Sequence, residues 1–163
     1  MLADQAREKN VWRRRGVAVI AVDTNILIYA HRYEHEWHAA AAASVQSLAQ
    51  GRAAWAIPWP CVHEFFSVVT RANVFSPPSR AAQAVTQLEA WFESPSLHLI
   101  GESVHHFTTL KRLAIGAKIQ GAAIHDARIA AICIDHGVAA LWTADRDFSR
   151  FPSLKVKNPL ARN

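Results

Sequence analysis

Four acidic residues lie in apolar stretches of the sequence rather than among polar residues. They are Asp23 in A-V-D-T-N, Glu64 in C-V-H-E-F-F, Asp126 in A-I-H-D-A-R and Asp145 in L-W-T-A-D-R-D. A buried carboxylate costs free energy unless it is paired with a base or bound to a metal ion. For any one of these acids alone, a helix cap or an ion pair with Arg71 or Arg128 is a sufficient explanation.

Considered together, the four acids indicate a shared metal site. Two carboxylates about 4 Å apart repel each other by roughly 4 kcal/mol at an effective dielectric constant of 20, so a cluster of four needs cations. A set of oxygen ligands selects hard ions, which here means Mg²⁺ or Mn²⁺. Such ions lower the pKa of a bound water and stabilise the leaving oxygen. The chemistry that this pattern favours is hydrolysis at phosphorus.

Two of the acids follow short apolar runs. Residues 17–22 (V-A-V-I-A-V) end at Asp23, and residues 138–143 (V-A-A-L-W-T) lead into Asp145. Short, unbroken runs of this kind are typical of strands that are buried on both faces. In an open α/β sheet the carboxyl ends of the strands form the edge at which ligands bind. We therefore expect both acids at one edge of a sheet.

The rest of the chain alternates between helix and strand. Further strands are expected over residues 53–58, 97–100 and 154–156, and helices over residues 26–30, 37–50, 59–71, 80–92, 103–114 and 121–135. The expected helix caps are polar side chains at the helix starts: Thr24 or Asn25, Ser79 and Ser103. The alternation predicts an α/β fold, a three-layer α/β/α sandwich with a short, mainly parallel sheet of four or five strands.

Composition limits the class of protein. The chain has 163 residues, 51% of them hydrophobic and 19% charged, which is typical of one folded globular domain. No apolar run approaches the roughly 20 residues that span a membrane, and no glycine-rich phosphate loop indicates a nucleotide cofactor. Cys61 and Cys133 lie far apart in apolar surroundings, which is typical of reduced thiols. We expect a cytoplasmic chain without a membrane partner.

The net charge of +5 is concentrated at the two ends. Residues 1–20 hold five Lys/Arg and two acids, and residues 146–163 hold five Lys/Arg and one acid. Basic ends around an acidic centre suit a polyanionic substrate, although solvated tails would explain the charge equally well. Residues 1–16 show no apolar period, so we expect a loosely ordered basic extension there, followed by a single domain over residues 17–163.

Four motifs, in order along the chain, resemble those of PIN-domain ribonucleases. They are V-D-T-N at residues 22–25, the helical Glu64, I-H-D-A-R-I-A at residues 124–130 and T-A-D-R-D-F at residues 143–148. The ending R-F-P-S-L-K-V-K-N-P-L at residues 150–160 resembles that of VapC-type toxins of type II (VapBC) toxin–antitoxin systems. The resemblance extends from about residue 17 to the end, and the fold it implies is similar to the sandwich predicted above.

The resemblance implies a metal-dependent endoribonuclease toxin that hydrolyses RNA with Mg²⁺ or Mn²⁺ as its cofactor. The implied catalytic and metal-binding acids are Asp23, Glu64, Asp126 and Asp145, with Asp147 as a candidate fifth ligand. Asn25 and Thr143 resemble the polar residues that position the ligands or the attacking water. The implied partners are the RNA substrate, a cognate VapB-type antitoxin and a second copy of the chain in a homodimer.

The role of several other residues stays open. Arg128 and Arg146 could contact substrate phosphates or neutralise the acids. Trp59 could stack on RNA bases, although tryptophans at helix and strand spacing are usually core residues. The group His31, His35 and His38 is more typical of surface histidines than of a metal site. A PIN nuclease that processes RNA without an antitoxin, and a non-catalytic RNA-binding PIN module, are the alternative functions.

Overall fold

A five-stranded parallel sheet runs through the middle of the protein in the computed structural model, which describes residues 16–161. The strands are β1 (Ile20–Val22), β2 (Trp55–Pro58), β3 (Leu97–Ile100), β4 (Ala140–Trp142) and β5 (Val156–Lys157). Their order is β3-β2-β1-β4-β5, and each adjacent pair is parallel. The predicted short parallel sheet is confirmed.

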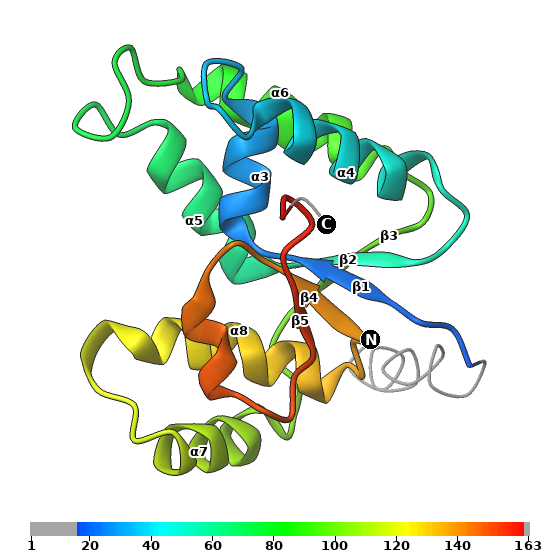
Figure 1. Ribbon diagram of the computed structural model, residues 1–163, viewed down its shortest axis with the longest axis vertical. Coiled ribbons are helices and arrows are strands. Elements are labelled where there is room, and N and C mark those ends of the chain that lie inside the picture. Colours follow the sequence, from blue (N-terminus) through cyan, green and yellow to red (C-terminus); the bar gives the residue numbers. More distant parts are fainter. Residues whose placement is uncertain (1–15, 162–163) are drawn as a thin grey trace.

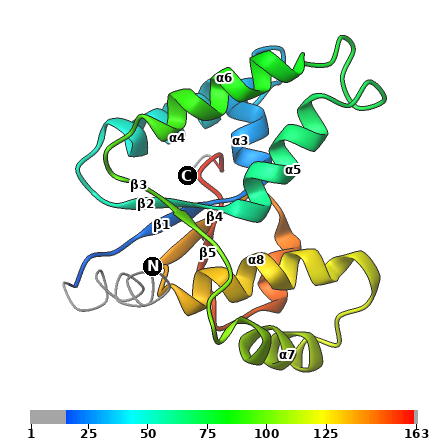
Figure 2. The same ribbon diagram turned by 180° about the vertical axis from the view of Figure 1, so that it is seen from behind.

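Helices cover both faces of this sheet (Figures 1 and 2). One face carries α3 (Thr24–His31), α4 (His38–Gln50), α5 (Trp59–Val69) and α6 (Ala81–Phe92). The other carries α7 (His106–Gly116) and α8 (Ile124–Asp135), together with the 3₁₀ turns η1 (Gly121–Ala123) and η2 (Arg146–Arg150). The predicted three-layer α/β/α sandwich is therefore confirmed.

The strand order makes β1 the point at which the connections diverge. From β1 the chain continues to β2 and β3 on one side, and then crosses to β4 and β5 on the other. Because all strands are parallel, Asp23 after β1 and Thr143 after β4 leave the sheet at the same edge. The backbone N–H of Asp23 donates to the carbonyl of Trp142 at 2.9 Å. Such a switch point leaves a crevice at the carboxyl edge of the sheet.

Helix α5 shows how an apolar period sets which side chains face the core. Its buried residues include Cys61, Phe65 and Val69, whereas His63 and Glu64 are exposed. Residues four apart lie on one face of a helix, so one apolar stripe fixes the orientation of the whole element. This orientation turns Cys61 inward and leaves Glu64 at the border of the buried face.

The start of α3 differs from the predicted cap. Asp23, rather than Thr24 or Asn25, is the N-cap, and its carboxylate accepts a hydrogen bond from the backbone N–H of Thr24 at 2.8 Å. The Thr24 hydroxyl instead donates to Glu64 at 2.9 Å. A short polar side chain bonds to whichever donor or acceptor lies nearest, and here a tertiary partner competes with the local one.

Two further predicted caps are wrong for the same reason. Helix α6 starts after Arg80, whose backbone N–H donates to the Gln83 side chain, while the Ser79 hydroxyl accepts from Arg32. Helix α7 starts at His106 with His105 as its N-cap, and the Ser103 hydroxyl donates to Asp135 at 2.7 Å while accepting from the backbone N–H of His105 at 3.0 Å. Each serine hydroxyl is hydrogen-bonded to a long-range partner that the local sequence does not reveal.

Two sequence predictions, the N-terminal extension and the domain boundary, involve residues outside the described range. Of the predicted N-terminal extension over residues 1–16, residues 1–15 lie outside the described range, so the extension and the domain boundary stay predictions. Within residues 16–161, no helix combines the length and apolar character needed to cross a membrane.

Candidate active site and metal centre

Asp23 is buried at the carboxyl end of β1 and is held by four donors. Its Oδ1 accepts from the backbone N–H of Thr24 at 2.8 Å and from the thiol of Cys61 at 3.6 Å. Its Oδ2 accepts from Thr143 Oγ1 at 2.7 Å and from Asn25 Nδ2 at 3.3 Å. Burial raises the pKa of Asp23 to about 6; the hydrogen bonds from Thr143 and Thr24 oppose this rise, and the Glu64 carboxylate adds to it.

Thr143 connects Asp23 to the acidic turn after β4. Its hydroxyl, which donates to Asp23, accepts from the backbone N–H of Asp145 at 3.0 Å and from Asn25 Nδ2 at 3.1 Å. Asn25 Oδ1 in turn accepts from the backbone N–H of Ala144 at 3.1 Å. These bonds hold the segment that carries Asp145 against the first turn of α3.

Asp126, Asp145 and Asp147 form a second group of acids, here called the three-acid cluster. One carboxylate oxygen from each lies within 4.8 Å of those of the other two. Asp126 is in the first turn of α8, and Asp145 caps η2 by accepting from the backbone N–H of Asp147 at 2.8 Å. Burial, followed by the charge of Asp145, raises the pKa of Asp126. Like charges this close repel, so the cluster favours a cation.

Glu64 interacts electrostatically with an acid of each group. Its carboxylate is bonded to Thr24 and is not part of the three-acid cluster. Its charge nevertheless contributes to the raised pKa of both Asp23 and Asp126. The four acids that the sequence singled out are thus brought to one edge of the sheet, as two connected groups rather than one.

Comparison with known proteins assigns the family. The family model of the PIN domain matches residues 20–154. The chain belongs to the PIN-domain family. It is 30% identical over 143 residues to the ribonuclease VapC43 of Mycobacterium tuberculosis, covering 87% of this chain and 96% of that protein. It is 26% identical over 139 residues to ribonuclease VapC48 of the same species, covering 85% and 96%.

Solved structures show the same PIN fold. VapBC2 from Rickettsia felis, bound to a DNA fragment from its promoter, gives a TM-score of 0.65 at 22% identity, covering 86% of this chain and 98% of that chain. VapC20 from Mycobacterium tuberculosis, a toxin that cleaves the Sarcin-Ricin loop, gives 0.60 at 15% identity, covering 80% and 92%. At these identities the likeness concerns the fold, and it agrees with the sandwich described above.

The two arginines that the sequence singled out, Arg128 and Arg146, have different surroundings in the structure. Arg128 is paired with Glu102, so it does not neutralise the acids of the site. Arg146 is exposed at the first residue of η2, next to Asp145. Arg150, which sequence reasoning missed, pairs with Asp147 at 3.4 Å, and its charge opposes the rise in the pKa of Asp126. The i,i+3 spacing of this pair was the available signal.

Trp59 follows β2 directly and therefore lies at the carboxyl edge of the sheet. It is 39% exposed, and its ring packs near His63 and edge-on to Phe92, with centroid separations of 5.9 and 6.3 Å. Its partly exposed ring at this edge is accessible to a substrate. Arg71, the other suggested partner for an acid, donates to Ser67 instead.

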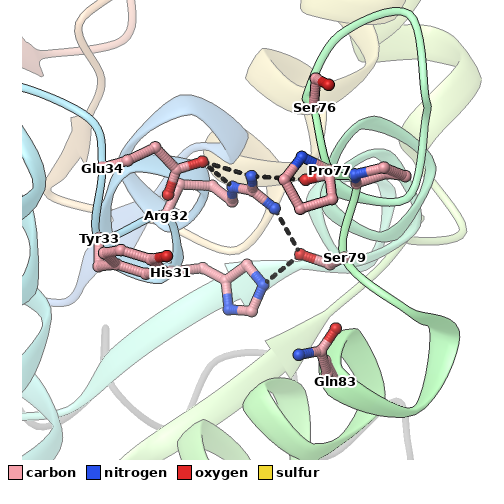
Figure 3. Close-up of a pocket in the computed structure, with 9 residues that line it drawn as sticks. His31, Arg32, Tyr33, Glu34, Ser76, Pro77, Ser79 and Gln83 are labelled. Carbon is pink, nitrogen blue, oxygen red and sulfur yellow. Dashed lines mark hydrogen bonds and ion pairs between the residues drawn. The ribbon is translucent and has the colours of Figure 1, made fainter.

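A hollow of about 340 Å³ lies at the opposite end of α3 from Asp23 (Figure 3). The buried Arg32 guanidinium donates there to Ser79 Oγ and to the Pro77 carbonyl, both at 2.9 Å, and pairs with Glu34. His31 Nε2 also contacts Ser79 Oγ at 2.9 Å. His31 is thus part of this hollow. Among residues 16–161, the three-acid cluster is the one group suited to hold a metal ion, so the histidine alternative finds no support.

Proposed function

We propose that this PIN domain is a Mg²⁺- or Mn²⁺-dependent endoribonuclease and the toxin of a toxin–antitoxin pair. The observation that carries the proposal is the position of the three-acid cluster beside the Asp23–Thr143 bond, at the switch point of the sheet. The similar proteins VapC43 and VapC48 are both named ribonucleases, which supports RNA as the substrate class.

The donor set of the site fits a hard divalent ion. The three-acid cluster offers carboxylate oxygens from Asp126, Asp145 and Asp147. Such oxygens are the ligands that Mg²⁺ and Mn²⁺ prefer. We propose these residues as the first ligands and Asp23 and Glu64 as the further acids of the site. When bound, the ion would lower the pKa of a water and stabilise the leaving oxygen.

The residues around Asp23 hold its carboxylate in a fixed orientation, and their hydrogen bonds oppose the effect of burial, which favours the protonated form. With a pKa of about 6, Asp23 is mostly ionised at neutral pH, so it can bind a cation or accept a proton from water. Thr143 and Asn25 tie it to the backbone that carries Asp145. The site is therefore largely organised by hydrogen bonds before any ion arrives, which lowers the cost of assembling it.

Basic and aromatic residues at the same edge suit an RNA chain. Arg146 is exposed beside the three-acid cluster, and Lys157 ends β5 on the adjacent strand. We propose that these two cations contact phosphates and that the exposed face of Trp59 stacks on a base. The guanidinium of Arg128 already binds Glu102, so we propose that it contacts a phosphate only if RNA displaces that carboxylate.

A VapB-type antitoxin is the partner that we infer for this chain. The similar structures include VapBC2 from Rickettsia felis and VapBC-1 from nontypeable Haemophilus influenzae, which shares 16% identity at a TM-score of 0.64 and covers 88% of this chain and 99% of that chain. The predicted homodimer belongs to the same proposal, and sedimentation of the purified chain would test it.

The decisive experiment is cleavage of total cellular RNA by the purified protein. Reactions contain Mg²⁺, Mn²⁺ or a chelator and compare the wild type with Asp126→Asn; Glu89→Gln, an exposed acid on α6, is the matched control. We expect discrete products that require both the metal ion and Asp126, and no effect of Glu89→Gln. RNA binding without cleavage, and without stabilisation by metal ions, would identify a non-catalytic module.

The toxin role needs a separate test in cells. Induction of the wild-type chain alone should arrest growth, induction of Asp126→Asn should not, and co-expression of a VapB-type protein encoded beside it should restore growth. If the active nuclease leaves growth unaffected, the chain is a PIN nuclease that processes RNA without an antitoxin.

A further inference from the structure

A buried thiol lies against the carboxylate of Asp23. Cys61 Sγ is 3.6 Å from Asp23 Oδ1 in hydrogen-bonding geometry, and the residue has no exposed surface. Cys61 is the third residue of α5 and belongs to the apolar stripe that packs this helix into the core. Among the hydrogen bonds of residues 16–161, it is the one that reaches Asp23 from α5.

This thiol completes the set of donors around the carboxylate. Oδ2 is bonded on one side to α3 and on the other to the segment after β4, through Asn25 and Thr143. Oδ1 is bonded to the neighbouring backbone of Thr24 and to Cys61. Without the thiol, Oδ1 would keep a single donor from the adjacent residue, and nothing from the facing helix would fix the rotation of the carboxylate.

We propose that Cys61 is a positioning residue, whose S–H bond to Oδ1 sets the orientation in which Asp23 meets the metal ion. The inference rests on the proposed nuclease function and deepens it. A thiol in apolar surroundings stays protonated and is therefore a donor at neutral pH. It also packs like a small apolar side chain, so one residue serves both the core stripe of α5 and the carboxylate.

Cys133 offers a matched control within the same chain. It is equally buried, on α8, and near enough to Asp23 for the charge of that carboxylate to raise its pKa, but its side chain makes no hydrogen bond with any residue in the described range. Truncating either cysteine to alanine removes one buried sulfur atom, but only Cys61→Ala removes a donor to Asp23. Both variants lose a buried sulfur atom near Asp23, so the difference between them reports on the hydrogen bond.

The test measures Mg²⁺ binding by calorimetry, with thermal unfolding and cleavage of a mapped RNA as further readouts. We expect Cys61→Ala to weaken Mg²⁺ binding by about five- to tenfold, as loss of a group that orients a ligand does. Cys133→Ala should leave the affinity within about twofold while losing similar stability. Cys61→Ser, which keeps a donor, should restore most of the affinity. If Cys61→Ala does not fold, Cys61→Val removes the donor while filling the space.

Two results would overturn the inference. One is an equal change in Mg²⁺ affinity in Cys61→Ala and Cys133→Ala, which would reduce Cys61 to a packing role. The other is the absence of rescue by a folded Cys61→Ser. In both cases the wild type still binds Mg²⁺ and cleaves RNA, so the nuclease function survives. A wild type that neither binds Mg²⁺ nor cleaves RNA would overturn the function and this inference together.

Discussion

Thr143 Oγ1 donates a hydrogen bond of 2.7 Å to Asp23 Oδ2, which joins the ends of two adjacent parallel strands. The same hydroxyl accepts from the backbone N–H of Asp145, the first acid of the turn that follows. One side chain thereby sets the position of an acid from β1 relative to an acid from the three-acid cluster.

Replacing Thr143 by valine should separate the two acids. Thr143→Val has a similar shape but leaves Asp23 Oδ2 without its shortest donor and the backbone N–H of Asp145 without an acceptor. We expect a loss of about 1–3 kcal/mol in the free energy of unfolding and a tenfold or greater loss of cleavage rate. Thr143→Ser keeps the hydroxyl and should retain both the stability and the cleavage rate of the wild type. Chemical denaturation and single-turnover cleavage measure the two effects.

Neutralising Asp126 should abolish cleavage without unfolding the protein. Asp126→Asn removes one of the three charges of the three-acid cluster. In the wild type, burial and then the charge of Asp145 raise the pKa of Asp126. The metal-free variant should therefore be as stable as the wild type or more stable. Urea denaturation in the presence of chelator measures the free energy of unfolding of both metal-free proteins. Marked unfolding of the variant would instead make Asp126 a structural residue.

Asp23 should contribute stability to the metal-free protein that is lost as the pH rises from about 4 to above 6. The folded protein raises the pKa of Asp23 from 3.8 to about 6, so it binds this proton more tightly than the unfolded chain does. The contribution is fully present below the unfolded pKa and is lost as the pH rises through the folded one. The shift corresponds to about 3 kcal/mol. Asp23→Asn should flatten the profile in this window, measured by urea denaturation at each pH with chelator present.

Adding Mg²⁺ should reverse that loss at neutral pH. An ion that binds only the folded state, at one hundred times its dissociation constant, contributes about 2.7 kcal/mol. We expect the effect to vanish in Asp145→Asn, which removes a carboxylate of the three-acid cluster. Asp135→Asn should keep it, since Asp135 lies at the other end of α8 and accepts from Ser103 and Thr109. Thermal unfolding with and without Mg²⁺ provides the measurement.

The interactions of Arg32 in the hollow should contribute to the stability of the protein and not to catalysis. The guanidinium is buried, stacks 4.3 Å from the centre of the Phe75 ring and is bonded to Ser79 and to the Pro77 carbonyl. Arg32→Met keeps the alkyl chain but leaves the Pro77 carbonyl without this donor, Glu34 without its cation and Ser79 with His31 alone, so we expect a loss of about 2–3 kcal/mol. RNA cleavage at a temperature where the variant is folded should match the wild type. A selective loss of cleavage would show that this end of α3 contributes to the active site.

Local pattern was enough to predict the layers of this fold. Unbroken apolar runs before Asp23 and before Asp145 predicted two of the parallel strands, and the helix expected over residues 59–71 is α5. Gly137, at φ 67°, follows the end of α8, because glycine adopts the left-handed conformation without strain. These features depend on side chains within one or two turns of each other, so the sequence alone carries them.

The sequence by itself therefore determined the layers, the sheet type and that the acids after β1 and β4 leave the sheet at one edge. Only the tertiary structure decided the individual partners. It assigned Asp23 rather than Thr24 as the cap of α3, directed Arg128 to Glu102, and set Cys61 against Asp23. The physical reason is the difference in sequence separation between the residues that interact. Periodicity and strand order act through neighbouring residues, whereas a hydrogen bond or ion pair forms with whichever group the packed layers bring within about 3 Å, however distant it is in the chain.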